Sequence, residues 1–165
     1  MASRSTLIEA RQITSPRVGA LHRYWQSKRR DGLLPTRAAI DPIEIPRLLP
    51  YLVIAEIEPS PMRIRYRLVG TQVVEDNGSD FTNRYIEECS FAVEPLLLEC
   101  YRRLVETQAP VFAYYEWHKR DLQGAKGAVG ANETGFFPLS SDGVNVDLAI
   151  SLADPNVPPY PPDKL

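Results

Sequence analysis

The stretch 62–69, which reads MRIRYRLV, alternates apolar and basic residues. On an extended chain the arginines fall on one side, and the apolar set on the other side is Met62, Ile64, Tyr66 and Leu68. This two-residue period predicts a strand of an antiparallel sheet, with one face on a core and one in water. The arginines are open to two interpretations: an anion-binding stripe, or a solvated strand face balanced by nearby acids.

Four more strands are predicted around this one. An apolar run at 52–57 precedes it, and the aromatic-rich residues 111–119 follow after a helical region. Residues 125–139 contain glycines that leave the register of this strand open, and residues 144–152 alternate again, with even-numbered residues inward. The sequence Ser141-Asp142-Gly143 predicts a turn between the last two strands.

Helices are predicted before and between the strands. Ser15 and Pro16 are typical of a helix start, and Gly32 follows the end of a helix expected over 16–31. A short helix is expected near 42–48 and a longer one over 95–107, whereas 70–90 is rich in turn residues. Strands separated by a helical block predict an α+β domain with an antiparallel sheet.

Composition narrows the class of protein. The 165 residues suit one domain, and the formal net charge of −2 argues against a nucleic-acid binder. No apolar run is long enough to span a membrane, and two cysteines suit a reducing compartment, so we expect a cytoplasmic protein.

The 15 prolines gather at both ends of the chain and mark its expected divisions. We expect residues 1–14 to be disordered and 15–50 to form an N-terminal helix with a proline-rich lead-in. Residues 51–153 are the expected core, and 154–165 an extended, mobile tail.

Four segments in order carry a family resemblance. They are 41–50 (DPIEIPRLLP), 65–71 (RYRLVGT), 77–82 (NGSDFT) and 138–143 (PLSSDG). Together they resemble a bacterial stand-alone PAS-like family of the PAS domain superfamily. Asn83 takes a place where the family pattern suggests glycine, and asparagine also tolerates positive φ. The resemblance implies a five-stranded antiparallel sheet with short helices on one face, a flanking N-terminal helix and a cavity for a small molecule.

The resemblance, together with strand parity, suggests the residues of such a cavity. Two polar handles, Thr71 and Asn77, and an aromatic wall are expected, the wall consisting of Tyr66, Phe81, Tyr101, Tyr115 and Trp117. The alternative is that these rings simply fill the core. PAS domains also dimerise through the N-terminal helix and the outer sheet face, which here present Leu21, Trp25, Phe112 and Tyr114. Alternatively, the helix covers its own sheet.

Cofactor chemistry finds little support in the sequence. A haem-type domain needs an axial histidine on the helix that faces the cavity, and the only histidines are His22 and His118, outside that helix. A flavin-photosensing domain needs a reactive cysteine in a specific motif. Cys89 lies between acids, and Cys100 falls on the apolar stripe of a helix. No metal-ligand spacing is found.

The predicted function is therefore a non-catalytic sensory or regulatory domain. It would bind a small apolar or aromatic molecule, form a homodimer or contact a partner protein that carries the output, and bind no nucleic acid or membrane. A pure interaction module with a filled core is the first alternative. A small cone-like isomerase or dehydratase using Glu116, His118 and Asp121 is the second.

Overall fold

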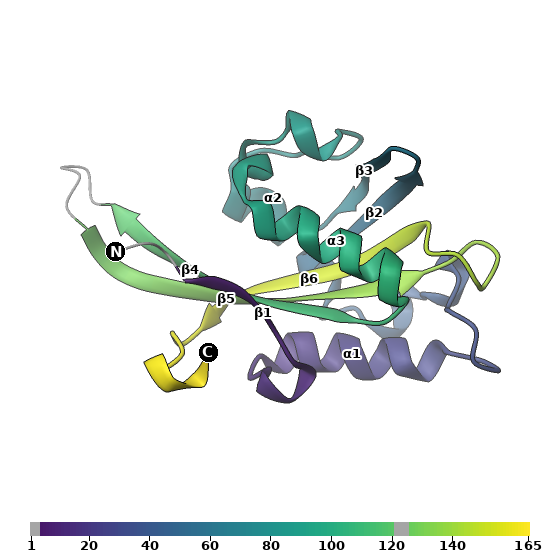
Figure 1. Ribbon diagram of the computed structural model, residues 1–165, viewed down its shortest axis with the longest axis horizontal. Coiled ribbons are helices and arrows are strands. Elements are labelled where there is room, and N and C mark those ends of the chain that lie inside the picture. Colours follow the sequence, from purple (N-terminus) through teal and green to yellow (C-terminus); the bar gives the residue numbers. More distant parts are fainter. Residues whose placement is uncertain (1–3, 121–125) are drawn as a thin grey trace.

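An antiparallel sheet of six strands, ordered β1-β4-β5-β6-β2-β3, forms the centre of the chain (Figure 1). The computed structural model describes residues 4–120 and 126–165, without the side chains of residues 93, 117–120 and 126–129. The strands are β1 (Ser5–Ile8), β2 (Leu52–Pro59), β3 (Met62–Val69), β4 (Val111–Arg120), β5 (Lys126–Leu139) and β6 (Leu148–Val157). The predicted α+β class and antiparallel sheet are confirmed.

Helices cover both faces of the sheet (Figure 1). Helix α1 (Pro16–Lys28) lies along one face against β5 and β6. On the other face lie α2 (Thr71–Asn77), two 3-10 turns at 86–88 and 90–93, and α3 (Pro95–Thr107), which packs on β4 and β5. The Ser15 hydroxyl accepts the Val18 amide at 3.1 Å, so it caps α1 as predicted.

Alternate residues of β5 belong to two separate layers of the core. Phe137 points to α1, where its ring lies 6.1 Å from that of Trp25. The neighbouring Phe136 points the other way, and its ring lies 5.3 Å from that of Tyr101 on α3. The strict two-residue period of a strand thus divides the apolar side chains between the two faces.

Strand β3 follows its predicted alternation as far as Tyr66 and departs from it at Leu68. Ile64 and Tyr66 are buried, but Leu68 is 37% exposed. The register with β2 shifts between Ile54 and Ala55, which places an extra residue in β3 and turns Leu68 away from the core.

The arginines of β3 are engaged within the chain. Arg63 pairs with Glu87, and Arg67 pairs with Glu56. Arg65 donates to the Asn83 carbonyl at 3.3 Å. These pairings favour the solvated strand face over an anion stripe.

Both chain ends differ from our expectation of mobile termini. Residues 5–8 add strand β1 to the edge of β4, so the sheet has one strand more than predicted. At the other end, β6 continues to Val157, and the Tyr160 side chain is buried. The proline-rich composition suggested a free tail, but Asp154 accepts the hydroxyl of Ser15, which caps α1, and the Tyr160 hydroxyl lies 2.8 Å from the Gln12 carbonyl oxygen.

Two further local predictions are corrected, and one is confirmed. The region 144–147 is a loop rather than the start of the last strand, with Val144 55% exposed. The helix expected near 42–48 is a single 3-10 turn, Pro42–Glu44. Asn83 adopts the predicted positive φ, 66°. No helix in the described ranges combines the length and apolarity needed to cross a lipid bilayer.

Candidate ligand-binding cavity

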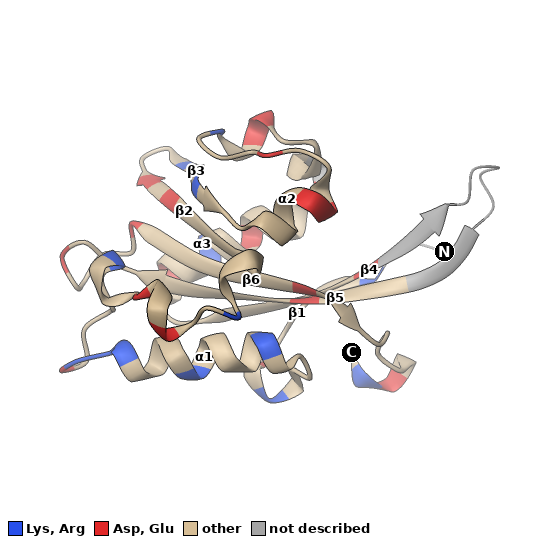
Figure 2. Cartoon of the chain, turned by 180° about the vertical axis from the view of Figure 1, so that it is seen from behind, with Lys and Arg blue, Asp and Glu red and all other residues tan. Residues whose placement is uncertain are grey.

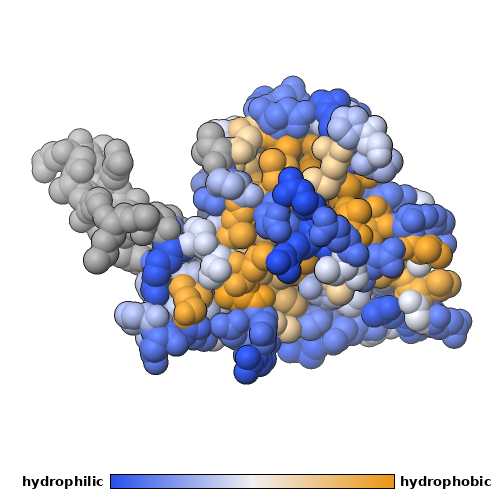
Figure 3. All heavy atoms as spheres, in the orientation of Figure 1, coloured by the Kyte–Doolittle hydropathy of each residue, from blue (hydrophilic) through white to orange (hydrophobic). Residues whose placement is uncertain are grey.

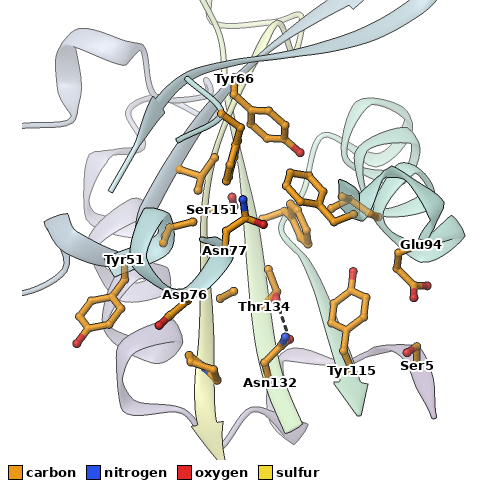
Figure 4. A pocket seen from close by; sticks show the side chains of 18 of the residues that line it. Ser5, Tyr51, Tyr66, Asp76, Asn77, Glu94, Tyr115, Asn132, Thr134 and Ser151 are labelled. Carbon is orange, nitrogen blue, oxygen red and sulfur yellow. Dashed lines mark hydrogen bonds between the residues drawn. The ribbon is translucent and has the colours of Figure 1, made fainter. Parts of the chain in front are cut away.

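A cavity of about 470 Å³ lies between the sheet and the helices on its α3 side. Strands β3 to β6, helix α2, the turn at 90–93 and helix α3 each contribute side chains to its wall (Figure 4). The volume falls within the range of roughly 300–1,000 Å³ that is common for small-molecule sites. The α1 face of the sheet lies on the opposite side.

Aromatic rings form most of the apolar wall. Tyr66, Phe81 and Phe91 make a three-way cluster of edge contacts, with centroid separations of 4.8 Å, 5.0 Å and 5.8 Å. Tyr101 and Phe136 form another edge contact at the sheet surface. These rings pack against one another and line the cavity.

Hydroxyl groups are the main polar groups deep in the cavity. Burial raises the pKa of Tyr66 and of Tyr101 far above the ordinary value for tyrosine. Hydrogen bonding with Tyr66 and Ser151 counteracts part of the rise in the pKa of Tyr101. Both phenols are protonated at neutral pH, as ordinary tyrosines are, and their hydrogen bond to each other makes them a polar pair in the wall.

Thr134 and Asn132 add polar groups on the β5 side of the cavity. The Thr134 hydroxyl donates to Asn132 Oδ1 at 3.2 Å (Figure 4). Tyr115, from β4, points its hydroxyl into the same space in this view and lies 4.0 Å from the Cys100 sulfur.

Three acidic residues lie at the cavity edge, namely Asp76, Glu94 and Glu116, but the Glu116 side chain points to the face of the sheet opposite to that of Tyr115. Arg4 binds Glu116, and the Tyr114 hydroxyl donates to the same carboxylate at 2.6 Å. Asp76 accepts the Gln72 amide at 2.9 Å, and Glu94 accepts the Leu96 backbone amide at 3.3 Å.

Most of the site residues expected from sequence come together here. Those that line the cavity are Tyr66, Asn77, Phe81, Tyr101 and Tyr115. Thr71 does not line it, because the side chain lies exposed at the start of α2. The Trp117 side chain lies outside the described residues.

Sequence reasoning missed several wall residues. Phe91 lies in a turn-rich segment without periodicity, so nothing in the sequence pointed to it. Thr134 and Phe136 alternate on β5, and Ser151 and Ala153 alternate on β6, all on the cavity side. Strand parity could have found these four residues once the register of β5 was known.

The residues expected at a dimer interface lie inside the chain. Leu21, Trp25, Phe112 and Tyr114 are all buried between α1, the chain termini and the sheet. Trp25 donates its indole N–H to the Pro138 carbonyl at 2.8 Å. The expected assignment of these four residues to an exposed interface is therefore wrong, and the alternative, in which the helix covers its own sheet, describes the structure.

Among the described side chains, no histidine or cysteine lines the cavity. His22 packs against Phe112 and Phe137 on the α1 face, and burial lowers the pKa of this imidazole. Burial also raises the pKa of Cys89, and it raises the pKa of Cys100 to about 12, so both thiols are poor nucleophiles. His118 lies outside the described side chains. The described residues form no group of three or more metal-ligating side chains.

Comparison with known proteins agrees with this architecture. The sequence model of a PAS domain family matches residues 13–127, most of the chain. The chain therefore belongs to the PAS domain family, a class of sensory and regulatory domains.

Solved structures also match, one of them an RNA-binding light-oxygen-voltage receptor. It aligns with a TM-score of 0.46 and 11% sequence identity, over 93% of this chain and 38% of the receptor chain. This chain thus spans well under half of that receptor's length. A search of curated proteins finds no match.

Proposed function

We propose that this PAS domain binds a small apolar or aromatic molecule in the cavity. The presence or absence of the ligand would then be signalled to a partner protein that carries the output. The observation that carries the proposal is the cavity of about 470 Å³ between sheet and helices. Its wall is mainly aromatic, and a few hydroxyls converge on it, an arrangement typical of small-molecule sites.

A pure interaction module with a filled core is the competing proposal. A filled core would bring the rings of Tyr66, Phe81 and Phe91 against those of the sheet, since protein interiors pack densely. The volume between these groups of rings supports ligand binding instead.

A catalytic role has weaker support. Of the residues named for it, Glu116 is the one whose side chain the structure describes, and His118 and Asp121 lie outside that part. Glu116 accepts hydrogen bonds from Arg4 and Tyr114, which supports a structural role for its carboxylate.

Native mass spectrometry and titration with tryptophol, a neutral aromatic alcohol, test the binding proposal. We expect the purified protein either to carry a small molecule or, when empty, to bind tryptophol. Ala153→Phe places a ring at the cavity wall and should weaken tryptophol binding by at least tenfold. Ala38→Phe, at an exposed site away from the cavity, is the matched control. A bare mass together with no tryptophol binding would contradict the proposal.

Homodimerisation, a protein partner and a cytoplasmic location stay predictions. A dimer would need a surface other than the four buried residues named above. Sedimentation velocity across micromolar concentrations tests it, and a monomer throughout would refute the dimer.

A further inference from the structure

We infer that the cavity selects a cationic ligand, an amine attached to an apolar or aromatic body. This inference rests on the proposed function, because it specifies the ligand class of the same cavity. It is drawn from the charges around the wall, which sequence patterning did not reveal.

The charged groups that line the cavity are all acidic among the described residues. The two whose side chains face it are Asp76 on α2 and Glu94 at the start of α3, whereas Glu116 on β4 turns its side chain to the other face of the sheet, toward Tyr114. Arg4 compensates Glu116. Within the described part of the chain, no ion pair involves Asp76 or Glu94, so their charges are available to the cavity.

Glu94 is the carboxylate best placed to act on a ligand. Its Oε1 holds the N-terminal turn of α3 through the Leu96 amide, which fixes the side chain at the cavity edge. Burial is the main cause of the raised pKa of Tyr115, and the charge of Glu94 contributes to it. Figure 4 shows both side chains on the same side of the cavity. The negative field of Glu94 therefore reaches groups that face the ligand space.

The aromatic wall favours the same sign of charge. The faces of aromatic rings attract cations, and they do so more strongly where water is excluded. Tyr66 and Tyr101 are neutral at pH 7, as ordinary tyrosines are, so they add no charge to the wall. A cationic head near Glu94 would meet a carboxylate and ring faces, whereas an anion would meet repulsion with no described basic residue in the wall.

Figure 2 shows the distribution of charge on the two sides of the molecule. Acidic residues lie around α2 on the cavity side, and Lys and Arg residues mark the outer side of α1. Arginines also lie on β3 and α3, so the preference for a cation is expected from the acidic residues of the wall and not from the charge of this whole side.

The test compares three probes that share an indole body and differ in charge. Tryptamine is cationic, tryptophol neutral and indole-3-propionate anionic at pH 7. In isothermal titration calorimetry we expect tryptamine to bind at least tenfold more tightly than indole-3-propionate, with tryptophol between them. Glu94→Gln keeps an oxygen that can cap α3 and removes the charge, so it should reduce this preference by at least threefold.

Glu106→Gln is the matched control on the same helix. It lies twelve residues beyond Glu94, about 18 Å along the helix axis, and its exposed side chain does not line the cavity. We expect it to leave the probe preference unchanged.

The outcomes separate the two proposals. Binding of tryptophol with no preference for tryptamine, or a preference that Glu94→Gln does not change, would overturn the cationic ligand and leave the binding proposal intact. A failure of all three probes to bind a protein whose native mass is bare would overturn both.

Discussion

Glu133 is fully buried in β5, and its carboxylate joins both ends of the chain. It accepts the backbone amides of Thr14 and Ser15 at 2.9 Å and 2.7 Å and also the Thr14 hydroxyl at 2.6 Å. The Tyr160 hydroxyl, from the C-terminal segment, donates to it as well. The carboxylate lies at the start of α1, where the helix dipole favours negative charge.

We predict that Glu133→Gln lowers the free energy of unfolding by about 3 kcal/mol, because a buried charge-assisted network loses acceptors and gains a misplaced donor. Urea denaturation measures the change, with Glu106→Gln as the exposed control. A loss below about 1 kcal/mol would show that the carboxylate contributes little to holding the termini.

Asp142, in the loop before β6, is expected to make a pH-dependent contribution to the stability of the fold. Backbone hydrogen bonds from Asn145 and Val144, at 2.7 Å and 2.8 Å, hold the pKa of this carboxyl well below its usual value. A lowered pKa in the folded state stabilises the protein above the unfolded pKa of about 4, and this stabilisation is lost as the pH falls toward the folded value.

Asp142→Asn should therefore reduce stability at pH 7, and its difference from the wild type should shrink below pH 4, as unfolding at a series of pH values will show. A difference that stays constant from pH 7 to pH 3 would disprove this role of the charge.

At the level of secondary-structure elements, β1 is the least expected part of the sheet. The Glu116 amide donates to the Arg4 carbonyl at 2.8 Å, and Thr6 lies opposite Tyr114. In an antiparallel pair the amides alternate in direction, so the amide of Tyr114 also faces β1, whereas those of Ala113 and Tyr115 face β5.

Removal of residues 1–8 should accordingly speed hydrogen exchange at the amides of Tyr114 and Glu116. The amides of Ala113 and Tyr115 are internal controls and should stay protected by β5. NMR-detected exchange measures all four amides. Equal rates in both proteins at Tyr114 and Glu116 would mean that β1 does not pair in solution.

At the level of the whole molecule, the sheet separates two environments. Helix α1 covers one face (Figure 1), and the other face holds the cavity lined by α2 and α3. Figure 3 shows the α3 side, where apolar side chains surround the polar outer residues of this helix.

Substitution of Trp25 tests whether α1 belongs to the core of the domain or to a dimer interface. We predict that Trp25→Ala lowers the free energy of unfolding by about 3–5 kcal/mol, the usual cost of removing a buried tryptophan. The sedimentation coefficient of the folded variant should equal that of the wild type. Because this variant is strongly destabilised, Trp25→Phe provides a milder second measurement. A change of oligomeric state in either variant would return Trp25 to a dimer interface.

Local patterning was sufficient for much of the fold and part of the site. The alternation in 62–69 predicted the inward Ile64 and Tyr66, and Ser15 and Pro16 predicted the start of α1. The cavity-facing side of Tyr115 was predicted correctly because alternation along a strand depends only on neighbouring residues. These successes depend only on neighbours within a few residues.

Periodicity and helix caps act over short distances, and they were enough to predict five of the six strands, helices α1 and α3, and four of the aromatic residues of the cavity wall, namely Tyr66, Phe81, Tyr101 and Tyr115. The attachment of the chain ends to the sheet depends on long-range contacts, since their partners, Glu116 and Glu133, are more than a hundred residues from β1 and α1. Only the tertiary structure decided that Leu68 leaves the core, because a bulge depends on the opposite strand. The acidic edge of the cavity, formed by Asp76 and Glu94, likewise arises only when α2 and α3 pack beside the sheet.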